Sequence, residues 1–388
     1  MVTIFTPVFN RKYIIHKLYE SLKRQTCKEF EWIVIDDGST DDVYELLQQW
    51  KTEEKGFPII VERVVNGGKH RAINRGVRLA SGEAFFIVDS DDYIADDAVE
   101  LIKKWWNSIC DNACFGGIAG LKAYHDRKVV GEKPMFDDFV DATNLERTQY
   151  GLLGDKAEVY RTSVLKKYPF PEYENENFVT EEIVWNRIAY EGLKIRWYNR
   201  AIYFCEYLED GLTKRGKALF ERNPKGWARH IHDSNVYGYW DRDKVMAAAF
   251  DFFETNYDRL SKEQIQEMLG LSSEEIMALE KKFFYISDQI KNLLEEQHCK
   301  TVAVYGVGNY GKRVLRYLKR IEVDISYLID QKLETYDGHT IHRLHDTFET
   351  VDCVCIALKK LPYDLKEKIC DKFPQSYVWA LSEEIDQF

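Results

Sequence analysis

The sequence predicts an α/β protein with a sheet flanked by helices, a helical connector and a smaller second α/β region. Short apolar runs alternate with amphipathic stretches over about the first ninety residues, and the same order returns over about the last ninety. Residues from about 236 to 297 carry a helical pattern instead. The chain of 388 residues is long enough for two or three domains of about 150 residues each. We therefore expect domains over residues 1–235, 236–297 and 298–388.

The alternation in the first region predicts a mostly parallel sheet with helices on both faces. The predicted strands are residues 2–6, 31–35, 57–65, 84–88, 194–198 and 202–207, with a strand-like region over 114–130. The predicted helices are residues 12–25, 42–50, 69–80, 97–109 and 181–191. Residues 134–178 are predicted to be loop-rich, because Pro134, Pro169 and Pro171 interrupt them.

Two capping boxes predict helix starts in the connector. Ser261 pairs with Gln264, and Ser272 pairs with Glu275. In the last region the predicted strands are residues 301–305, 325–329, 351–358 and 376–381, and a helix is predicted over residues 312–320.

The composition excludes several classes of protein. Lys and Arg number 54 against 65 Asp and Glu, a net charge of −11, whereas general nucleic-acid binding needs clustered positive charge. The sequence contains no run of about 18 apolar residues, the length needed to span a bilayer. Its first residues lack the basic and apolar regions of a signal peptide. The eight cysteines follow no zinc-site or disulfide spacing. We expect reduced thiols in a cytoplasmic protein.

Polar residues follow each of the first four predicted strands. These loops are T-P-V-F-N (6–10), D-D-G-S (36–39), N-G-G-K-H (66–70) and D-S-D-D (89–92). The carboxyl ends of parallel strands meet at one edge of an α/β sheet, where ligands bind, so we predict a binding site there. Turn formation and helix capping are the alternative for each loop taken alone.

Five aspartates in these loops indicate the kind of ligand: Asp36, Asp37, Asp89, Asp91 and Asp92. No Walker phosphate-binding sequence is present. A diphosphate can lie beside so many carboxylates only with a hard divalent cation between them. Asp37, at a glycine turn, is better suited to accept hydrogen bonds from a base or a ribose.

The four loops together resemble the nucleotide-sugar half of the inverting family 2 glycosyltransferases, whose fold is called GT-A. The matching stretches are T-P-V-F-N (6–10), V-I-D-D-G-S-T-D (34–41), N-G-G-K-H-R-A-I-N-R-G (66–76) and D-S-D-D (89–92). The similarity continues more weakly to about residue 230, through F-V-T-E-E-I-V-W-N-R (178–187). The resemblance implies a mixed, nucleotide-sugar-binding sheet.

The resemblance also implies roles for individual residues. Thr6 and Phe9 would line the nucleotide pocket, and Asp37 would hold the base. Asp89 and Asp91 would form the D-x-D pair, with Asp91 as the ligand of Mn²⁺ or Mg²⁺. Asp92 is an alternative metal ligand.

A basic triplet in the third loop is assigned in the same way. The resemblance implies that Lys69, His70 and Arg71 lie near the ribose or the diphosphate. Many family members have small residues here, so the triplet is equally compatible with the solvated face of the following helix.

The catalytic base of the family is an acid at the start of a helix, which here matches Glu181-Glu182. The positive end of a helix favours an ionised carboxylate, which can take a proton from an acceptor hydroxyl, but acids at helix starts are also common for stability alone. Neighbouring helix positions project about 100° apart, so the choice stays open, and we favour Glu181. One direct displacement, with a metal ion on the departing diphosphate, would invert the anomeric carbon.

Residues 211–232 combine basic side chains with Phe220 and Trp227. The basic residues are Lys214, Arg215, Lys217, Arg222, Lys225 and Arg229. Such a stretch is able to rest on anionic headgroups at the inner face of a membrane. An exposed charged loop and helix is the alternative, and charge runs more often have that role.

The last region carries a glycine motif between a predicted strand and a predicted helix. Gly306, Gly308 and Gly311, followed by Asp330, match the dinucleotide-binding arrangement of a Rossmann-like fold. The glycines are also needed to turn the chain and to pack helix on strand. A structural or partner-docking role is therefore favoured over a second nucleotide site.

These observations predict a cytoplasmic, metal-dependent glycosyltransferase. It would move a sugar from a nucleotide diphosphate sugar, a UDP-sugar, to a hydroxyl of a glycan or lipid-linked glycan in surface polysaccharide synthesis. Two alternatives are an NAD(P)-dependent sugar-modifying enzyme that uses the last domain and a non-catalytic nucleotide-sugar-binding scaffold. Peripheral membrane contact and a homo-oligomer are left open, and no nucleic-acid partner is expected.

Overall fold

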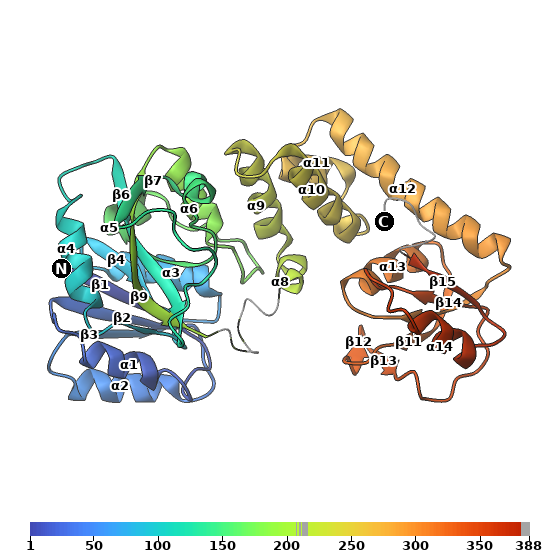
Figure 1. Ribbon diagram of the computed structural model, residues 1–388, viewed down its shortest axis with the longest axis horizontal. Helices are drawn as coiled ribbons and strands as arrows, with labels where there is room; N and C mark the ends of the chain where they lie inside the picture. Colours follow the sequence, from blue (N-terminus) through green and yellow to red (C-terminus); the bar gives the residue numbers. More distant parts are fainter. Residues whose placement is uncertain (207, 209–210, 212–215, 382–388) are drawn as a thin grey trace. The chain divides into compact units, whose positions relative to one another are not determined.

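The computed structural model describes residues 1–206, 208, 211 and 216–381 (Figure 1). The chain divides into two compact units, Met1–Ala248 and Ala249–Phe388. The division falls inside α10 (Arg242–Asn256), so the predicted helical connector is shared between the units, and the three-domain division stays a prediction. No helix within the described ranges has the length and apolar character needed to cross a membrane.

Nine of the described strands in the first unit form one sheet. They are β1 (Val2–Val8), β2 (Phe30–Asp36), β3 (Ile59–Arg63), β4 (Ala84–Ile87), β5 (Tyr93–Ile94), β6 (Phe115–Tyr124), β7 (Phe139–Ala142), β8 (Lys156–Arg161) and β9 (Lys194–Cys205). Their order is β3-β2-β1-β4-β8-β6-β9-β5, with β7 beside β9. The first four strands pair in parallel, whereas β4 pairs antiparallel with β8. The predicted α/β fold class, a mixed sheet flanked by helices, is confirmed.

Helices cover both faces of this sheet, because apolar side chains point to alternate faces along each strand. One face packs against α1 (His16–Lys23), α2 (Val43–Glu53) and α4 (Ala98–Asn107). The other packs against α3 (Lys69–Leu79), α5 (Thr162–Lys167) and α6 (Glu182–Tyr190). Helix α3 approaches β1 closely, and a Cβ on its Gly76 would lie 2.2 Å from the ring of Phe5. This contact requires glycine at position 76.

The prediction of a loop-rich stretch over residues 134–178 is wrong. The stretch contains β7, the 3-10 helix η1 (Asn144–Tyr150), β8 and α5. Strand β8 is central, since it pairs antiparallel with both β4 and β6. Its sequence, K-A-E-V-Y-R, alternates charged and apolar residues like a surface segment, yet Lys156 is only 2% exposed. The two strands predicted over 194–198 and 202–207 are one strand, β9, and residue 207 lies outside the described residues.

Two short helices follow β9 in the first unit, α8 (Lys217–Arg222) and α9 (Pro224–Val236). In the second unit, α11 (Lys262–Leu269) and α12 (Ser273–Glu296) begin at the two predicted capping boxes. In each box the serine accepts a backbone hydrogen bond and the third helical side chain accepts one in return. Both predicted helix starts are confirmed.

The described strands of the second unit form a smaller sheet. They are β10 (Thr301–Tyr305), β11 (Asp324–Ile329), β12 (Thr335–Tyr336), β13 (His339–His342), β14 (Cys353–Ile356) and β15 (Tyr377–Ala380). The order is β12-β13-β11-β10-β14-β15, and every pairing is parallel except that of β12 with β13. Helices α13 (Asn309–Arg320) and α14 (Leu365–Lys372) complete the alternating order.

Candidate functional site

The loops that follow β1, β2 and β3 contact one another at one edge of the first sheet. We call residues 6–10, 36–41, 66–71 and 89–92 the carboxyl edge. The backbone N–H of Asn10 donates to Ser39 Oγ at 2.9 Å, which joins the first loop to the second. The carboxylate of Asp37 accepts the backbone N–H groups of Gly67 and Gly68, each at 2.8 Å, which joins the second loop to the third.

The two aspartates after β2 have different surroundings. Asp36 is fully buried; it accepts the N–H of Ser39 at 2.9 Å and lies 2.6 Å from Arg63 Nε, so it stabilises its own turn. Burial raises the pKa of Asp37, although the N–H groups of Gly67 and Gly68 oppose the shift. Asp37 therefore holds the third loop in place, and its contact with a nucleobase stays a prediction.

Thr6 and Phe9, both predicted to line the pocket, lie in different environments. Thr6 is fully buried, and its hydroxyl accepts a hydrogen bond from Trp32 Nε1 at 3.0 Å. The predicted pocket contact by the Thr6 side chain is therefore corrected: at this position of β1 the side chain points into the core. Phe9 lies beyond the strand and is 43% exposed, so its ring is available to a ligand.

Lys69 joins two of the predicted functional acids. Its Nζ lies 2.6 Å from Asp89 Oδ1 and 2.8 Å from Glu181 Oε1. Burial alone would lower the pKa of Lys69, but Asp89 and Glu181 outweigh it and raise the pKa well above its usual value. Burial would likewise raise the pKa of Asp89, but Lys69 and Lys122 outweigh it and lower the pKa. Lys69 is therefore an ammonium group that pairs with both carboxylates.

The other two residues of the basic triplet point elsewhere. His70 is buried, and neither ring nitrogen has a partner among the residues the structure describes. Burial, with a contribution from Arg71, lowers the pKa of His70 to about 4. Arg71 donates to Glu172 at 3.1 Å and to the Tyr173 carbonyl at 2.5 Å. The triplet therefore does not act as one group, and its proximity to ribose or diphosphate stays a prediction.

The other two acids of the D-S-D-D segment, Asp91 and Asp92, have different surroundings. Asp91 keeps 20% of its side chain exposed and lies 3.9 Å from Arg11 Nε. Burial and Asp89 raise the pKa of Asp91, and they raise that of Asp92 to about 7. Asp92 is only 5% exposed and accepts a hydrogen bond from the Tyr203 hydroxyl at 2.7 Å. Asp91 is thus the more accessible of these two carboxylates.

The pair Asp89 and Asp91 fits a divalent cation in charge and donor type. Burial and Asp89 raise the pKa of Asp91, and a metal ion beside Asp91 would offset this effect, whereas Lys69 and Lys122 already lower the pKa of Asp89. Oxygen donors suit Mg²⁺ and Mn²⁺. In the part of the chain that the structure describes, however, no three acidic, histidine or cysteine side chains are grouped as metal ligands. A bound ion would therefore need further ligands from a substrate, such as phosphate oxygens.

The candidate bases Glu181 and Glu182 have unlike partners. Glu181, at the N-cap of α6, pairs with the charged Lys69. Glu182 accepts a hydrogen bond from the Tyr239 hydroxyl at 3.2 Å and lies 3.4 Å from His230 Nε2. Burial lowers the pKa of His230, which favours a neutral imidazole. Glu181 is therefore bound to a cation, whereas Glu182 lies between neutral groups.

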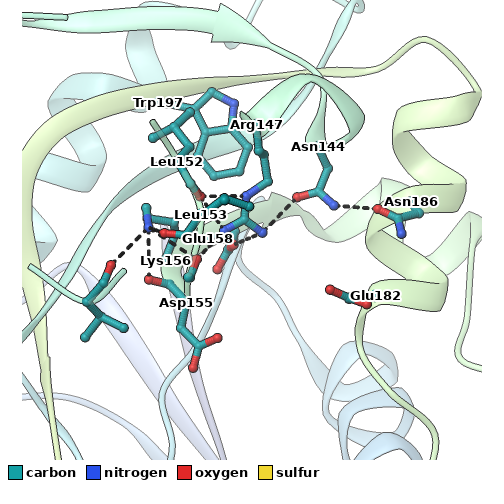
Figure 2. Close-up of polar contacts among 12 residues, drawn as sticks. Asn144, Arg147, Leu152, Leu153, Asp155, Lys156, Glu158, Glu182, Asn186 and Trp197 are labelled. Atoms are coloured by element: carbon teal, nitrogen blue, oxygen red, sulfur yellow. Dashed lines mark hydrogen bonds and ion pairs between the residues drawn. The ribbon is translucent and has the colours of Figure 1, made fainter. Parts of the chain in front are cut away.

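Several residues near this site were not predicted. Lys122 of β6 lies 4.0 Å from Asp89, and its ammonium group lies over the ring of Tyr203. The hydroxyl of Tyr203 accepts a hydrogen bond from the backbone N–H of Asp89 at 2.9 Å. On β8, Glu158 lies 3.9 Å from Arg147 of η1 (Figure 2). These residues come from β6, β8, β9 and η1, in a region without a recognisable motif.

The basic stretch at 211–232 is partly described. Lys214 and Arg215 lie outside the described residues. The ring of Phe220 packs edge-on against Phe178, with centroids 5.4 Å apart, and also contacts Trp227. These aromatic side chains therefore pack within the first unit, and membrane contact stays a prediction.

In the second unit the glycine motif and its acid are adjacent. Asp330 accepts the N–H of Val307 at 2.8 Å and also that of Lys332 at 2.8 Å. A Cβ on Gly311 would lie 1.9 Å from the Gly306 carbonyl oxygen, so close packing explains that glycine. No Cβ contact restricts Gly308. The second nucleotide site at Gly306, Gly308, Gly311 and Asp330 stays a prediction.

Part of the chain is similar to known proteins. The profile of Glycosyl transferase family 2 matches residues 3–168. Poly(ribitol-phosphate) beta-glucosyltransferase of Bacillus spizizenii is 30% identical over 177 residues, which cover 44% of this chain and 27% of that protein. Glycosyltransferase GlyA of Streptococcus pneumoniae is 35% identical over 182 residues, or 44% and 25% of the two chains. A structure of S. aureus TarS 1–349 in complex with UDP-GlcNAc superposes with a TM-score of 0.48 at 18% identity, covering 87% of this chain and 95% of that one.

The first unit thus contains an α/β domain in which residues 3–168 match the profile of Glycosyl transferase family 2. This match agrees with the predicted resemblance for that segment. The chain spans about a quarter of the length of the two curated relatives.

Proposed function

We propose that this protein is an inverting glycosyltransferase that moves a sugar from a nucleotide diphosphate sugar, a UDP-sugar, to a hydroxyl of a glycan or lipid-linked glycan in surface polysaccharide synthesis. The family match and the named relatives support the reaction class. One observation carries the proposal: Lys69 Nζ is within hydrogen-bonding distance of both Asp89 and Glu181. The acid expected at the diphosphate and the acids expected at the acceptor are thereby adjacent.

The donor diphosphate would lie at Asp89 and Asp91. These two carboxylates would hold Mn²⁺ or Mg²⁺, which when bound would supply a Lewis acid for the charge on the departing diphosphate. Asp92 would stabilise the segment through Tyr203 rather than bind the ion, because its carboxylate already accepts the tyrosine hydroxyl. Phe9, exposed at the same edge, offers a surface for a nucleobase.

Glu182 is the better candidate for the proton acceptor. The carboxylate of Glu181 already pairs with the Lys69 ammonium group at 2.8 Å, which would compete with an acceptor hydroxyl. The partners of Glu182 are neutral: the Tyr239 hydroxyl and the His230 imidazole. Glu182 would take the proton of the acceptor hydroxyl. At the same time the hydroxyl oxygen would bond to the anomeric carbon, and the bond between that carbon and the diphosphate would break. Glu181 would position Lys69.

The location and the second unit are part of the same proposal. All eight cysteines are free thiols in the structure, which supports a cytoplasmic location. The parallel order β13-β11-β10-β14-β15 and the glycine turn before α13 support a Rossmann-like second domain. Peripheral contact with a membrane surface and a homo-oligomer stay predictions.

A screen of nucleotide sugars tests this function. The purified protein would be incubated with UDP-, GDP- and dTDP-sugars, with and without Mn²⁺ or Mg²⁺, and release of the free nucleotide measured. We expect slow, metal-dependent hydrolysis of a UDP-sugar. Binding without hydrolysis or transfer would favour a non-catalytic scaffold. Nicotinamide cofactor binding that depends on Gly308 and Asp330, without nucleotide-sugar binding, would favour the sugar-modifying alternative.

A further inference from the structure

Strand β8 brings an unpredicted acid to the candidate site. It pairs antiparallel with β4, with Val159 opposite Phe86 and Tyr160 opposite Phe85. Because the strands run in opposite directions, Glu158 lies toward the end of β4 that leads into Asp89. The side chain of Glu158 is 14% exposed. A charged residue on a central strand is therefore within reach of a ligand at the D-S-D-D segment.

The carboxylate of Glu158 has few hydrogen-bond donors and cations near it among the described residues. Its nearest cation, Arg147, is 3.9 Å away and donates instead to the Leu152 carbonyl at 2.8 Å and to Asn144 Oδ1 at 3.3 Å. Within the described ranges no other side chain donates a hydrogen bond to the Glu158 carboxylate. Burial raises the pKa of Glu158, and Arg147 and Lys122 only oppose this. Carboxylates with so little exposure are normally hydrogen-bonded.

A second polar group beside Glu158 also lacks a partner. The hydroxyl of Tyr160 is buried and has no hydrogen-bond partner among the described residues. The charged groups that act on it are Glu158, Arg147 and Glu181. Its ring is fixed by stacking on Trp185 of α6, with centroids 4.2 Å apart. An orphaned buried hydroxyl costs about 1–3 kcal/mol, so a polar group that reached Tyr160 would stabilise this region.

A hydrogen bond joins η1 to α6 near these two groups. Asn144 of η1 donates to Asn186 of α6 at 2.7 Å, and Figure 2 shows this contact beside Arg147 and Glu158. The side of β8 that carries Glu158 is thus enclosed by η1 and by the helix that begins with the candidate bases. A ligand group held there would lie between the diphosphate position and the base.

We propose that Glu158 accepts a hydrogen bond from a hydroxyl of the donor's sugar and so selects an uncharged hexose or N-acetylhexosamine over a uronic acid. The proposal rests on the proposed function. A sugar hydroxyl supplies the donor that the carboxylate lacks. A sugar carboxylate in the same position would instead face Glu158, and like charges in a partly buried site repel.

The test measures sugar selectivity separately from nucleotide binding. Wild type, Glu158→Gln, Glu158→Asp and the exposed control Glu132→Gln would be assayed for hydrolysis of UDP-glucose, UDP-N-acetylglucosamine and UDP-glucuronate. The dissociation constant of UDP alone would be measured for each, and circular dichroism would verify folding.

We expect wild type to prefer a neutral sugar. Glu158→Gln should lower kcat/KM for that sugar about tenfold and narrow the preference over glucuronate, because the lost hydrogen bond and the lost repulsion act together. Its UDP dissociation constant should stay within about twofold of wild type. Glu158→Asp, which keeps the charge, should retain the discrimination against glucuronate, and Glu132→Gln should behave as wild type.

Two results would overturn the inference. In the first, wild type hydrolyses a neutral UDP-sugar and Glu158→Gln leaves its selectivity unchanged; the proposed function then stands and the role of Glu158 fails. In the second, Glu158→Gln weakens UDP and every UDP-sugar equally, which indicates a structural role. If wild type binds and hydrolyses no nucleotide sugar, the proposed function fails and the inference fails with it.

Discussion

The ammonium group of Lys69 lies 2.8 Å from the carboxylate of Glu181. Lys69 is the first residue of α3 and belongs to the carboxyl edge, and Glu181 is the N-cap of α6, more than a hundred residues later. The same nitrogen lies 2.6 Å from Asp89. This one side chain therefore fixes the distance between the segment expected to hold the diphosphate and the helix expected to supply the base.

Replacing Lys69 tests that relationship. In Lys69→Met the carboxylates of Asp89 and Glu181 lose their shared cation and repel each other, so the site should lose its geometry. We expect turnover of the UDP-sugar to fall about 100-fold, with a smaller change in KM. Nucleotide release under saturating donor measures this, and thermal unfolding verifies the fold. Lys17→Met, on an exposed position of α1, is the matched control. Turnover in Lys69→Met equal to that of the control would contradict the role.

The two acids at the start of α6 should differ when each is made neutral. Because Glu182 is proposed as the proton acceptor, Glu182→Gln should lower transfer by about 100-fold or more while leaving UDP binding intact. Glu181→Gln should lower transfer less, since it only loosens Lys69. If Glu181→Gln lowered transfer more than Glu182→Gln did, the assignments would be exchanged.

His70 should make the protein sensitive to acid. Burial lowers its pKa in the folded chain to about 4, against 6.5 in the unfolded chain. Between these values the unfolded chain binds a proton that the folded chain does not, so the free energy of unfolding falls as the pH falls. Between pH 7 and pH 5 this contributes a loss of about 2 kcal/mol.

Urea unfolding at the two pH values measures that loss. His70→Leu, which cannot titrate, should lose less stability than wild type on acidification. His16→Leu, at an exposed position, should follow wild type. An equal loss in wild type and His70→Leu would show that His70 is not held neutral.

The sequence predicted the first four strands and their polar loops because each strand is a short apolar run that ends in residues with turn propensity. Asp89 and Asp91 were found in this way, whereas Glu181 was assigned from the family resemblance. The sequence did not reveal β8, because K-A-E-V-Y-R has charged residues at alternate positions, as a surface strand does. Only the tertiary structure shows that Lys156 is buried and donates to the Leu153 carbonyl at 2.7 Å.

Individual side-chain directions were equally inaccessible from sequence. Thr6 belongs to a loop motif but is the last core-facing polar residue of β1. Its hydroxyl accepts a hydrogen bond from Trp32 Nε1. Lys122 and Tyr203 contact Asp89 from β6 and β9, at a sequence distance that no motif spans. The choice between Glu181 and Glu182 depends on the rotation of α6, which packing of Trp185 and Ile188 against the sheet determines.

The central claim is that the carboxyl edge holds a nucleotide diphosphate through an ion shared with Asp91. Titration calorimetry of UDP into wild type, Asp91→Asn and the exposed control Asp126→Asn, with Mn²⁺ or with a chelator, tests it most directly. We predict one UDP site in wild type and in the control, tighter with Mn²⁺ by at least about tenfold, and loss of that difference in Asp91→Asn. Equal UDP affinity with Mn²⁺ and with chelator in wild type, or a full Mn²⁺ effect in Asp91→Asn, would contradict the claim.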